Sequence, residues 1–213
     1  MITREQALGL IQEHVSNKNI IKHMIALEAV MGALHDELKS GRPSARVSTE
    51  LGRMSPGQNS LSDNFGSKSE WQMAGLLHDG DYCDEVPPNE QGIKITEWAR
   101  EKGYDIPGPV AHAMAAHNWD NTGVEPKNLM DWAIFCADSL TGLIVASALV
   151  LPDKKLASLT KESILKRFKS PSFAAGTRRE DIKKCEENLG FDLEEFVGIA
   201  LKSMQEIGNE LGL

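Results

Sequence analysis

Cysteine is scarce in this sequence of 213 residues, and its distribution excludes two common kinds of site. The three cysteines, Cys83, Cys136 and Cys185, are odd in number and far apart, and no CxxC pair occurs. This spacing argues against a disulfide framework and against a zinc site built from thiolates. We therefore expect the three thiols to be reduced.

The sequence also lacks a basic character and a secretion signal. Its net charge is −8, from 23 basic and 31 acidic side chains, which argues against general binding to duplex nucleic acid. The N-terminal residues, MITREQALGL, are charged and lack the apolar stretch of a signal peptide. We therefore expect a cytoplasmic protein.

Only one apolar run, residues 131–151, is long enough to raise the question of a membrane span. Asp138 lies in its centre, where a carboxylate would cost about 2.5–3.5 kcal/mol in a bilayer, and the flanks carry no basic stop signal. We interpret this run as a buried core helix and expect no membrane association.

No alternating strand pattern stands out, whereas helical periodicity recurs along the chain, so we predict an all-α fold. With 41% hydrophobic residues, the chain can form one substantial core. We predict a single domain over residues 1–213, with its core at about 19–151, an insertion loop at 40–69 and a helical extension at 153–213. The sequence does not decide whether the chain forms a homo-oligomer.

Several helix boundaries can be predicted from capping patterns and breakers. Thr3 and Gln6 form a capping box, and Asn19 is expected to cap a second helix with an apolar stripe from Ile20 to Leu38. Further helices are predicted at 90–102, 131–151, 153–168, 178–188 (with a capping box from Thr177 to Glu180) and 193–210 (capped by Asp192).

The stretch Trp71–Asp84, WQMAGLLHDGDYCD, ends an apolar helical run in a histidine and a carboxylate. His78 continues the inward face of this helix, and Asp79 lies about 100° further round, so both side chains could reach one cation. Gly80 is well suited to a left-handed residue that closes the helix. The dipeptide alone is a weak indication of a metal site.

Two further residues can complete a ligand set. His23 lies on a face adjoining the apolar stripe of the second helix, and Asp138 faces the core of its own helix. No Lys or Arg occurs between Lys127 and Lys154, so the Asp138 carboxylate needs a cation, a proton or a donor network from elsewhere. Together with His78 and Asp79 these residues would suit Mn²⁺, Fe²⁺, Co²⁺, Ni²⁺, Zn²⁺ or Mg²⁺.

The ordered set of His23, LLHDGDY, AHN at 116–118 and ADSLTGLIVA at 137–146 resembles the HD-domain superfamily of metal-dependent phosphohydrolases. More narrowly, the chain is similar to small bacterial members of unassigned substrate. The resemblance implies an all-helical fold with metal ligands at His23, His78, Asp79 and Asp138.

The chain departs from this pattern at one position. Relatives with two metals carry a histidine shortly after the His-Asp motif, where this sequence has Gln91, while His117 of the AHN motif is retained. Glutamine is a poor substitute for imidazole as a ligand. We therefore expect one metal ion, with His117 as a second-site ligand, a substrate contact or a plain core histidine.

The resemblance implies hydrolysis of a small phosphate ester, with a nucleotide as the commonest substrate, by attack of a metal-activated water. Asp79 would act as a catalytic ligand, and Asp81 would orient or deprotonate the water. The substrate's charge would be offset by Lys22, Lys94 or Arg178. Residues 154–184 hold ten basic and three acidic side chains, which fits either a solvated helix face or a positive wall beside the substrate.

Two alternatives remain open. The chain could be a regulatory module that keeps the metal and senses a nucleotide without hydrolysing it, and Gln91 favours this interpretation. It could also be a purely structural helical domain, in which case the four predicted ligands would not converge.

Overall fold

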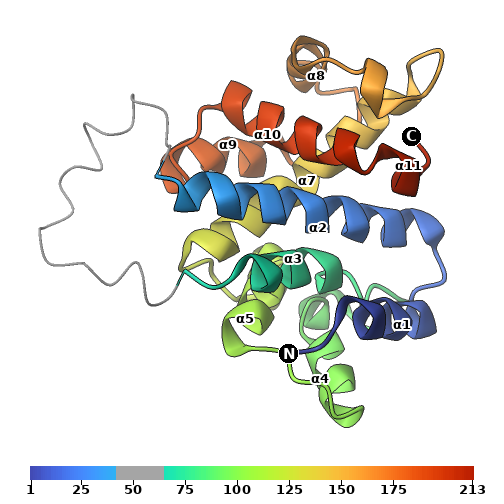
Figure 1. Cartoon of the computed structure of the whole chain (residues 1–213), viewed down its shortest axis with the longest axis vertical. Helices are drawn as coiled ribbons and strands as arrows, with labels where there is room; N and C mark the ends of the chain where they lie inside the picture. Colours follow the sequence, from blue (N-terminus) through green and yellow to red (C-terminus); the bar gives the residue numbers. More distant parts are fainter. Residues whose placement is uncertain (42–64) are drawn as a thin grey trace, which may run out of the picture.

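The protein folds entirely from helices in the part of the chain that the structure describes. The structure is a computed structural model that describes residues 1–41 and 65–213 (Figure 1). No strand occurs within these ranges, which confirms the predicted all-α class. Most of the predicted 40–69 loop lies outside the described residues.

The helices within these ranges are α1 (Arg4–His14), α2 (Lys18–Lys39), α3 (Lys68–Leu77), the 3-10 helix η2 (Pro88–Glu90), α4 (Lys94–Glu101), α5 (Gly108–His117), α6 (Trp119–Thr122), α7 (Leu129–Leu149), the 3-10 helix η3 (Leu156–Ser158), α8 (Lys161–Phe168), α9 (Arg179–Asn188), α10 (Leu193–Glu206) and α11 (Gly208–Leu211).

Helix α2 crosses the middle of the molecule and organises the packing around it. Figure 1 shows α1 and α3–α5 on one side of α2 and α8–α11 on the other. Helix α2 packs against α3, α7 and α10. Its predicted apolar stripe is fully buried at Met24, Leu27, Met31 and Leu34 and partly exposed at the two ends, Ile20 and Leu38. One apolar cluster extends from Ile2 to Leu211.

Helices α2 and α3 approach each other closely because Gly75 has no side chain. A Cβ atom at Gly75 would lie 2.7 Å from the carbonyl oxygen of Leu27 and 2.9 Å from the amide nitrogen of Glu28. Both distances are shorter than side-chain carbons tolerate. The glycine therefore sets the separation of the two helices that carry His23 and His78.

Helix α7 lies in the core, as predicted. It begins where the Asn128 side chain accepts hydrogen bonds from the amides of Met130 and Asp131, and it packs against α2, α5, α8 and α9. Among the described residues it is the one helix that is long and apolar enough to cross a membrane, and 61% of its apolar window is buried in the protein.

The capping predictions had mixed outcomes. The box at Thr3 and Gln6 is formed, and Asp192 accepts a hydrogen bond from the Glu195 amide at 2.8 Å, so both are confirmed. The predicted cap at Asn19 was wrong, because the Asn17 side chain accepts the Asn19 amide and starts α2 two residues earlier.

The predicted capping box from Thr177 to Glu180 was also wrong. The N-cap of α9 is Arg178, and no side chain caps the helix. The Thr177 amide donates instead to the Ala174 carbonyl, because the preceding segment folds as a turn.

Three predicted helices are interrupted. The helix predicted at 90–102 splits into η2 and α4, because Gly92 adopts a φ of +84° between them. The helix predicted at 153–168 splits into η3 and α8, and Lys154 has a φ of +54° at its start. The helix predicted at 193–210 divides into α10 and α11 near Ile207.

Gly75→Ala should destabilise the fold by about 1–3 kcal/mol, because the new methyl group would overpack the α2–α3 contact. Urea unfolding of the variant and the wild type measures this difference. It should also weaken metal binding, since His23 and His78 would be moved apart.

Gly9→Ala is the matched control. Gly9 lies in α1, and no atom lies within 4 Å of the place that a Cβ would take, so alanine should be neutral or slightly stabilising there. Equal stability of Gly75→Ala and wild type would contradict the proposed role of the close contact.

Candidate metal centre

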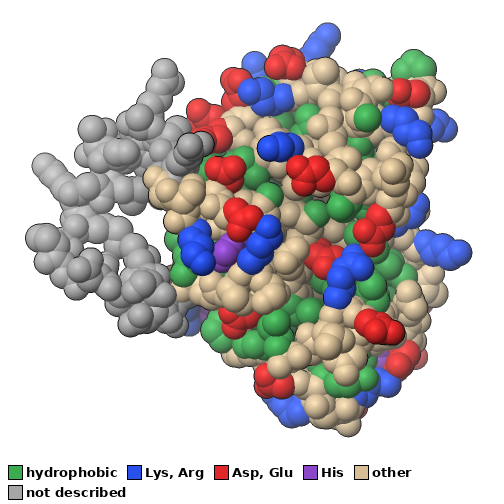
Figure 2. Space-filling view, in the orientation of Figure 1, with side chains coloured by type: hydrophobic (Ala, Val, Ile, Leu, Met, Phe, Trp, Pro, Cys, Tyr) green, Lys and Arg blue, Asp and Glu red, His purple; other side chains and the backbone are tan. Residues whose placement is uncertain are grey.

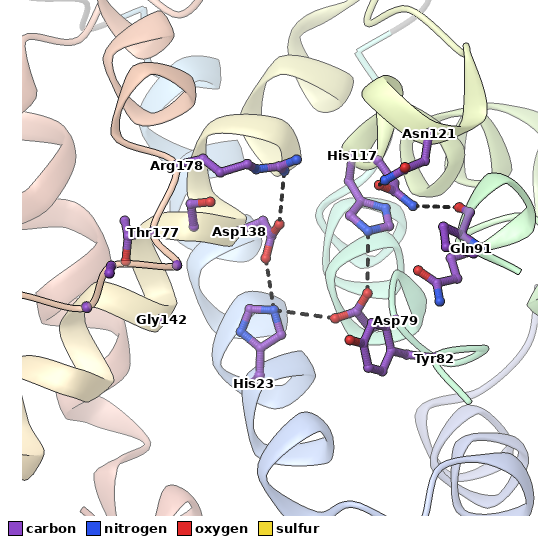
Figure 3. A pocket seen from close by; sticks show the side chains of 16 residues that line it. His23, Asp79, Tyr82, Gln91, His117, Asn121, Asp138, Gly142, Thr177 and Arg178 are labelled. Carbon is purple, nitrogen blue, oxygen red and sulfur yellow. Dashed lines mark hydrogen bonds and ion pairs between the residues drawn. The ribbon is translucent and has the colours of Figure 1, made fainter. Parts of the chain in front are cut away.

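Three helices and one turn bring five titratable side chains together at one cavity (Figure 3). His23 comes from α2, Asp79 from the turn after α3, His117 from the last residue of α5 and Asp138 from α7, and all four line a cavity of about 750 Å³. His78 is fully buried directly behind them. The structure therefore brings together the four predicted metal ligands.

The placement of His78 and Asp79 follows from the way α3 begins and ends. Ser67 and Glu70 form a capping box at its start, and Trp71 lies fully buried on its inward face. His78 caps the other end in a right-handed conformation. The expectation of a left-handed Gly80 was wrong: a Cβ there would lie 3.0 Å from the Ile95 side chain, so close packing accounts for this glycine.

The donor atoms are close enough to share one ion. His23 Nε2 lies 3.1 Å from His78 Nε2, 2.9 Å from Asp138 Oδ1 and 3.7 Å from Asp79 Oδ2. His78 Nε2 lies 3.4 Å from Asp79 Oδ2 and 3.9 Å from Asp138 Oδ1. Donors bound at about 2.0–2.2 Å from one ion are separated by roughly 3–4.4 Å. The spacings among His23, His78 and Asp79 fit this range, so these three residues could hold one ion. The 2.9 Å between His23 Nε2 and Asp138 Oδ1 is a hydrogen-bond distance.

Hydrogen bonds fix the tautomers of all three histidines in the cluster. His78 Nδ1 donates to the Gly75 carbonyl at 2.8 Å, and His117 Nδ1 donates to the Met114 carbonyl. A carbonyl oxygen can only accept, so Nδ1 carries the proton in each ring. The neutral form of each ring then presents an unprotonated Nε2 to the cavity.

The same tautomer follows for His23 from Thr141. The Thr141 hydroxyl donates to the Asp138 carbonyl at 2.7 Å, which uses its only proton. It therefore accepts from His23 Nδ1, which lies 3.0 Å away. His23 also directs an Nε2 lone pair at the cluster, where two carboxylates already lie. Such an arrangement needs a cation or added protons.

The pKa values show what happens when protons take that role. Burial lowers the pKa of the His23 imidazole, but the hydrogen-bonded carboxylate of Asp138 and the charge of Asp79 outweigh it, and the net pKa is raised. Burial likewise opposes the shift at Asp138, yet His23 brings the pKa of its carboxyl down to about 2. The pKa of Asp79 lies well below its usual range, because the neighbouring histidines, His78 first, outweigh burial.

His117 contacts the other oxygen of Asp79. Its Nε2 lies 3.4 Å from Asp79 Oδ1, whereas Oδ2 faces His23 and His78. Burial lowers the pKa of His117, but Asp79 raises it by more. Gln91 lines the same cavity, and Figure 3 shows it on the far side of Asp79 from Asp138. His117 is thus placed beside the predicted metal ligands and open to the cavity.

The predicted role of Asp81 does not fit its position. Its carboxylate is fully buried and accepts the amides of Gly92 (2.8 and 3.0 Å) and Ile95 (2.9 Å), so it is not free to act on a water in the cavity. Gly92 in turn packs so tightly that a Cβ there would lie 3.1 Å from the His117 ring. Asp81 therefore holds the segment that supports His117.

Two predicted substrate contacts are also misplaced. The Lys94 ammonium pairs with Glu97 at 2.6 Å on the surface of α4, away from the residues that line the cavity. The Lys22 ammonium lies 3.1 Å from the Cβ position of Gly212, near the C-terminus. A side chain next to a helical ligand points about 100° away from it, which explains the error at Lys22.

Arg178 does reach the cavity. Its guanidinium lies 3.7 Å from Asp138 Oδ2, which gives that carboxylate the cationic partner that its own helix lacks. Of the ten basic side chains in residues 154–184, Arg178 is the one that lines the cavity. Others form surface pairs, such as Lys161 with Glu194 at 2.6 Å. Figure 2 shows both signs of charge interspersed on the face in view.

The wall beside Arg178 is held by a residue that the sequence did not single out. The guanidinium of Arg179 donates to five backbone carbonyls of the preceding turn, those of Phe168, Ser170, Phe173, Ala174 and Thr177. Residues 174–177 line the cavity. The two consecutive arginines thus have separate roles, since Arg178 faces the cavity and Arg179 holds the turn that forms its wall.

Comparison with known proteins adds no relative. A scan against protein-family models found no match, and searches of curated proteins and of solved structures found no similar protein.

Metal binding should stabilise the protein more as pH rises. The folded-state pKa values of His23 and His117 are raised above their ordinary value of 6.5, so protonation stabilises the metal-free fold below about pH 6.5. That stabilisation is lost as pH rises through the raised values, whereas a divalent ion competes with fewer protons there. The Tm difference between Mn²⁺-saturated and chelated protein should be larger at about pH 8 than at about pH 6.

His78→Ala is the control for this experiment and should show little Mn²⁺ effect at either pH. A Tm difference in the wild type that is constant with pH would contradict the assignment of these imidazoles to the site.

Arg179→Gln should destabilise the protein by about 1–3 kcal/mol, because it leaves carbonyls of the 168–177 turn without their donor. Urea unfolding measures the loss, and limited proteolysis should detect faster cleavage within the turn. Lys183→Gln, which removes only a surface pair with Glu180, should leave both unchanged. Equal behaviour of the two variants would show that Arg179 does not hold the wall.

Proposed function

We propose that this protein is a metal-dependent phosphohydrolase of the HD-domain superfamily that acts on a small phosphate ester. The observation that carries the proposal is the convergence of the Nε2 atoms of His23, His78 and His117 on the carboxylates of Asp79 and Asp138. Histidines held by a hydrogen bond at Nδ1, with Nε2 directed at carboxylates, are typical of metal ligands. The sequence resemblance to HD-domain enzymes supports the same assignment.

The donor set suits a divalent metal with nitrogen and oxygen preference. His23, His78, Asp79 and Asp138 would hold such an ion, and its Lewis acidity would lower the pKa of a water and polarise a phosphoryl oxygen. The hydrogen bonds to the Gly75 carbonyl and to the Thr141 hydroxyl orient the two imidazoles.

The remaining residues of the cavity bind and orient the ester. Arg178 faces the phosphoryl oxygens and offsets their charge. Asn118 and Asn121 line the wall near His117, and the Asn121 amide donates to Asn118 at 2.6 Å, which fixes both side chains. These groups limit the poses that the ester can adopt.

His117 is placed to move the proton that the reaction requires. Hydrolysis forms a bond between a water oxygen and phosphorus and breaks the bond from phosphorus to the alcohol oxygen. One proton of the water remains on the phosphate product or passes to solvent, and the alcohol oxygen needs a proton of its own. His117 Nε2 can hold a proton, because Asp79 raises its pKa, and it is open to the cavity. It delivers this proton to the departing alcohol.

One observation favours a second candidate, a regulatory module that binds a nucleotide without hydrolysing it. Gln91 lies in the cavity at the position where the resemblance leads one to expect a histidine. A phosphate ester that raises the Tm of the metal-loaded protein but is recovered intact would support this candidate.

The test is phosphate release from the protein after chelation and reloading with Mn²⁺, Fe²⁺, Co²⁺, Ni²⁺, Zn²⁺ or Mg²⁺ in turn. Nitrophenyl phosphate, sugar phosphates and nucleotides serve as substrates. At least one metal should restore hydrolysis, and Asp79→Asn and Asp138→Asn should each lower kcat/KM by about 100-fold or more, as losses at metal sites do.

Asp105→Asn is the matched control, because Asp105 is exposed and pairs only with the N-terminus, at 3.6 Å, within the described part of the chain. Its activity should equal that of the wild type. A folded protein that releases no phosphate with any metal, or an Asp138→Asn variant with full activity, would exclude the proposed hydrolase.

A further inference from the structure

The cavity has two chemically different ends, and this difference bears on the substrate. Arg178 and Thr177 lie at one end, while Tyr82 and Gln91 lie at the other, with Asp79 between them (Figure 3). A phosphate ester that spans the metal ligands must direct its phosphoryl oxygens and its alcohol to opposite ends. The phosphoryl oxygens belong at the Arg178 end, because the guanidinium is there.

The end of the cavity at Arg178 can offset little additional negative charge. Arg178 is the one Lys or Arg among the described residues that line the cavity. Three carboxylates already surround its guanidinium, those of Asp138 (3.7 Å), Asp120 (3.7 Å) and Asp181 (2.8 Å). Because these carboxylates already offset the charge of Arg178, and no other Lys or Arg among the described residues lines the cavity, nothing there is available to offset the charge of a second phosphate.

A second cavity of about 660 Å³ adjoins the other end, and Tyr82, Pro88 and Gln91 line both cavities. The alcohol part of an ester that extends beyond Tyr82 would therefore meet the side chains of this second cavity. The volume is within the range of pockets that hold small organic ligands. Half of the Tyr82 side chain is exposed, which leaves its ring available to pack against such a molecule.

The second cavity is acidic. Glu13, Asp84 and Glu85 line it, and no Lys or Arg does so among the described residues. Glu13 is paired with Lys102 at 2.7 Å, whereas Asp84 and Glu85 form no ion pair within residues 1–41 and 65–213. A second phosphate or a carboxylate placed here would be repelled by these side chains. Neutral hydroxyl groups and amines would instead find hydrogen-bond acceptors.

On the basis of the proposed function, we infer that the substrate is an ester with one phosphate group and an uncharged or cationic polar alcohol. The phosphate lies between the metal ligands and Arg178, and the alcohol passes Tyr82 into the acidic cavity. Nucleoside monophosphates, sugar monophosphates and amino-alcohol phosphates belong to this class. Bisphosphates and nucleoside triphosphates are excluded by charge. Hydrolysis of the accepted ester yields the free alcohol and inorganic phosphate, as in the reaction above.

The experiment compares matched ligands by calorimetric binding to the Mn²⁺-loaded protein at fixed free Mn²⁺. Fructose 6-phosphate should bind at least about tenfold more tightly than fructose 1,6-bisphosphate. Phosphoethanolamine should also bind more tightly than phosphoglycolate, which has a carboxylate in place of the amine. Phosphate release is measured in parallel, so that the heat of any hydrolysis is separated from the heat of binding.

The double variant Asp84→Asn/Glu85→Gln tests the source of the selectivity. It should reduce the preference for fructose 6-phosphate over the bisphosphate by at least about threefold, since two repelling charges are removed. The control variant Glu90→Gln/Glu101→Gln makes the same change in net charge at exposed positions outside both cavities. Its preference should match that of the wild type.

Three outcomes overturn the inference: equal or tighter binding of the bisphosphate by the wild type, an unchanged preference in the Asp84/Glu85 variant, or an equal change in the control. Selective binding without phosphate release would retain the inference about ligand charge and reject the hydrolase. Phosphate release from monophosphates and bisphosphates alike would support the hydrolase and reject the inference about ligand charge. Failure of every ester to bind would reject both.

Discussion

The structure depends on an electrostatic constraint at the place where α2, α3, α5 and α7 meet. Three imidazoles, each held by a hydrogen bond at Nδ1, direct Nε2 at two carboxylates, and the donors of His23 and His78 are only 3.1 Å apart. Without positive charge these groups repel one another in a buried setting. Protons on the imidazoles can supply that charge, and so could a divalent ion held by His23, His78 and Asp79.

Close packing between helices holds the histidine and aspartate side chains in this arrangement. Gly75 lets α3 lie against the backbone of α2, and its carbonyl accepts a hydrogen bond from His78 Nδ1. One residue therefore sets both the position of α3 and the tautomer of His78. Asp81 holds Gly92, which packs on His117. From the other side of the cavity, Arg178 faces the cluster and Arg179 fixes the wall. The candidate metal centre and the helix packing therefore depend on the same contacts.

The helical class and the convergence of His23, His78 and Asp138 could be predicted from the sequence, because helical periodicity places these residues on inward faces. Prediction failed at Asp81, which lies in a turn whose direction no periodicity predicts and which accepts hydrogen bonds from amides. It failed at Lys22 for another reason, since this residue precedes His23 in α2 and lies on a different face of the helix. Arg179 could not be found, because the carbonyls that it binds converge only in the folded turn.

The most direct test of the metal centre is an anomalous difference map from a crystal grown with Mn²⁺ or Zn²⁺ and recorded at the absorption edge of the metal. We predict a peak bonded to the Nε2 atoms of His23 and His78 and to the carboxylates of Asp79 and Asp138, with Nδ1 of both histidines keeping its present partner. A map with no peak at this cluster in a metal-soaked, well-ordered crystal would contradict the assignment.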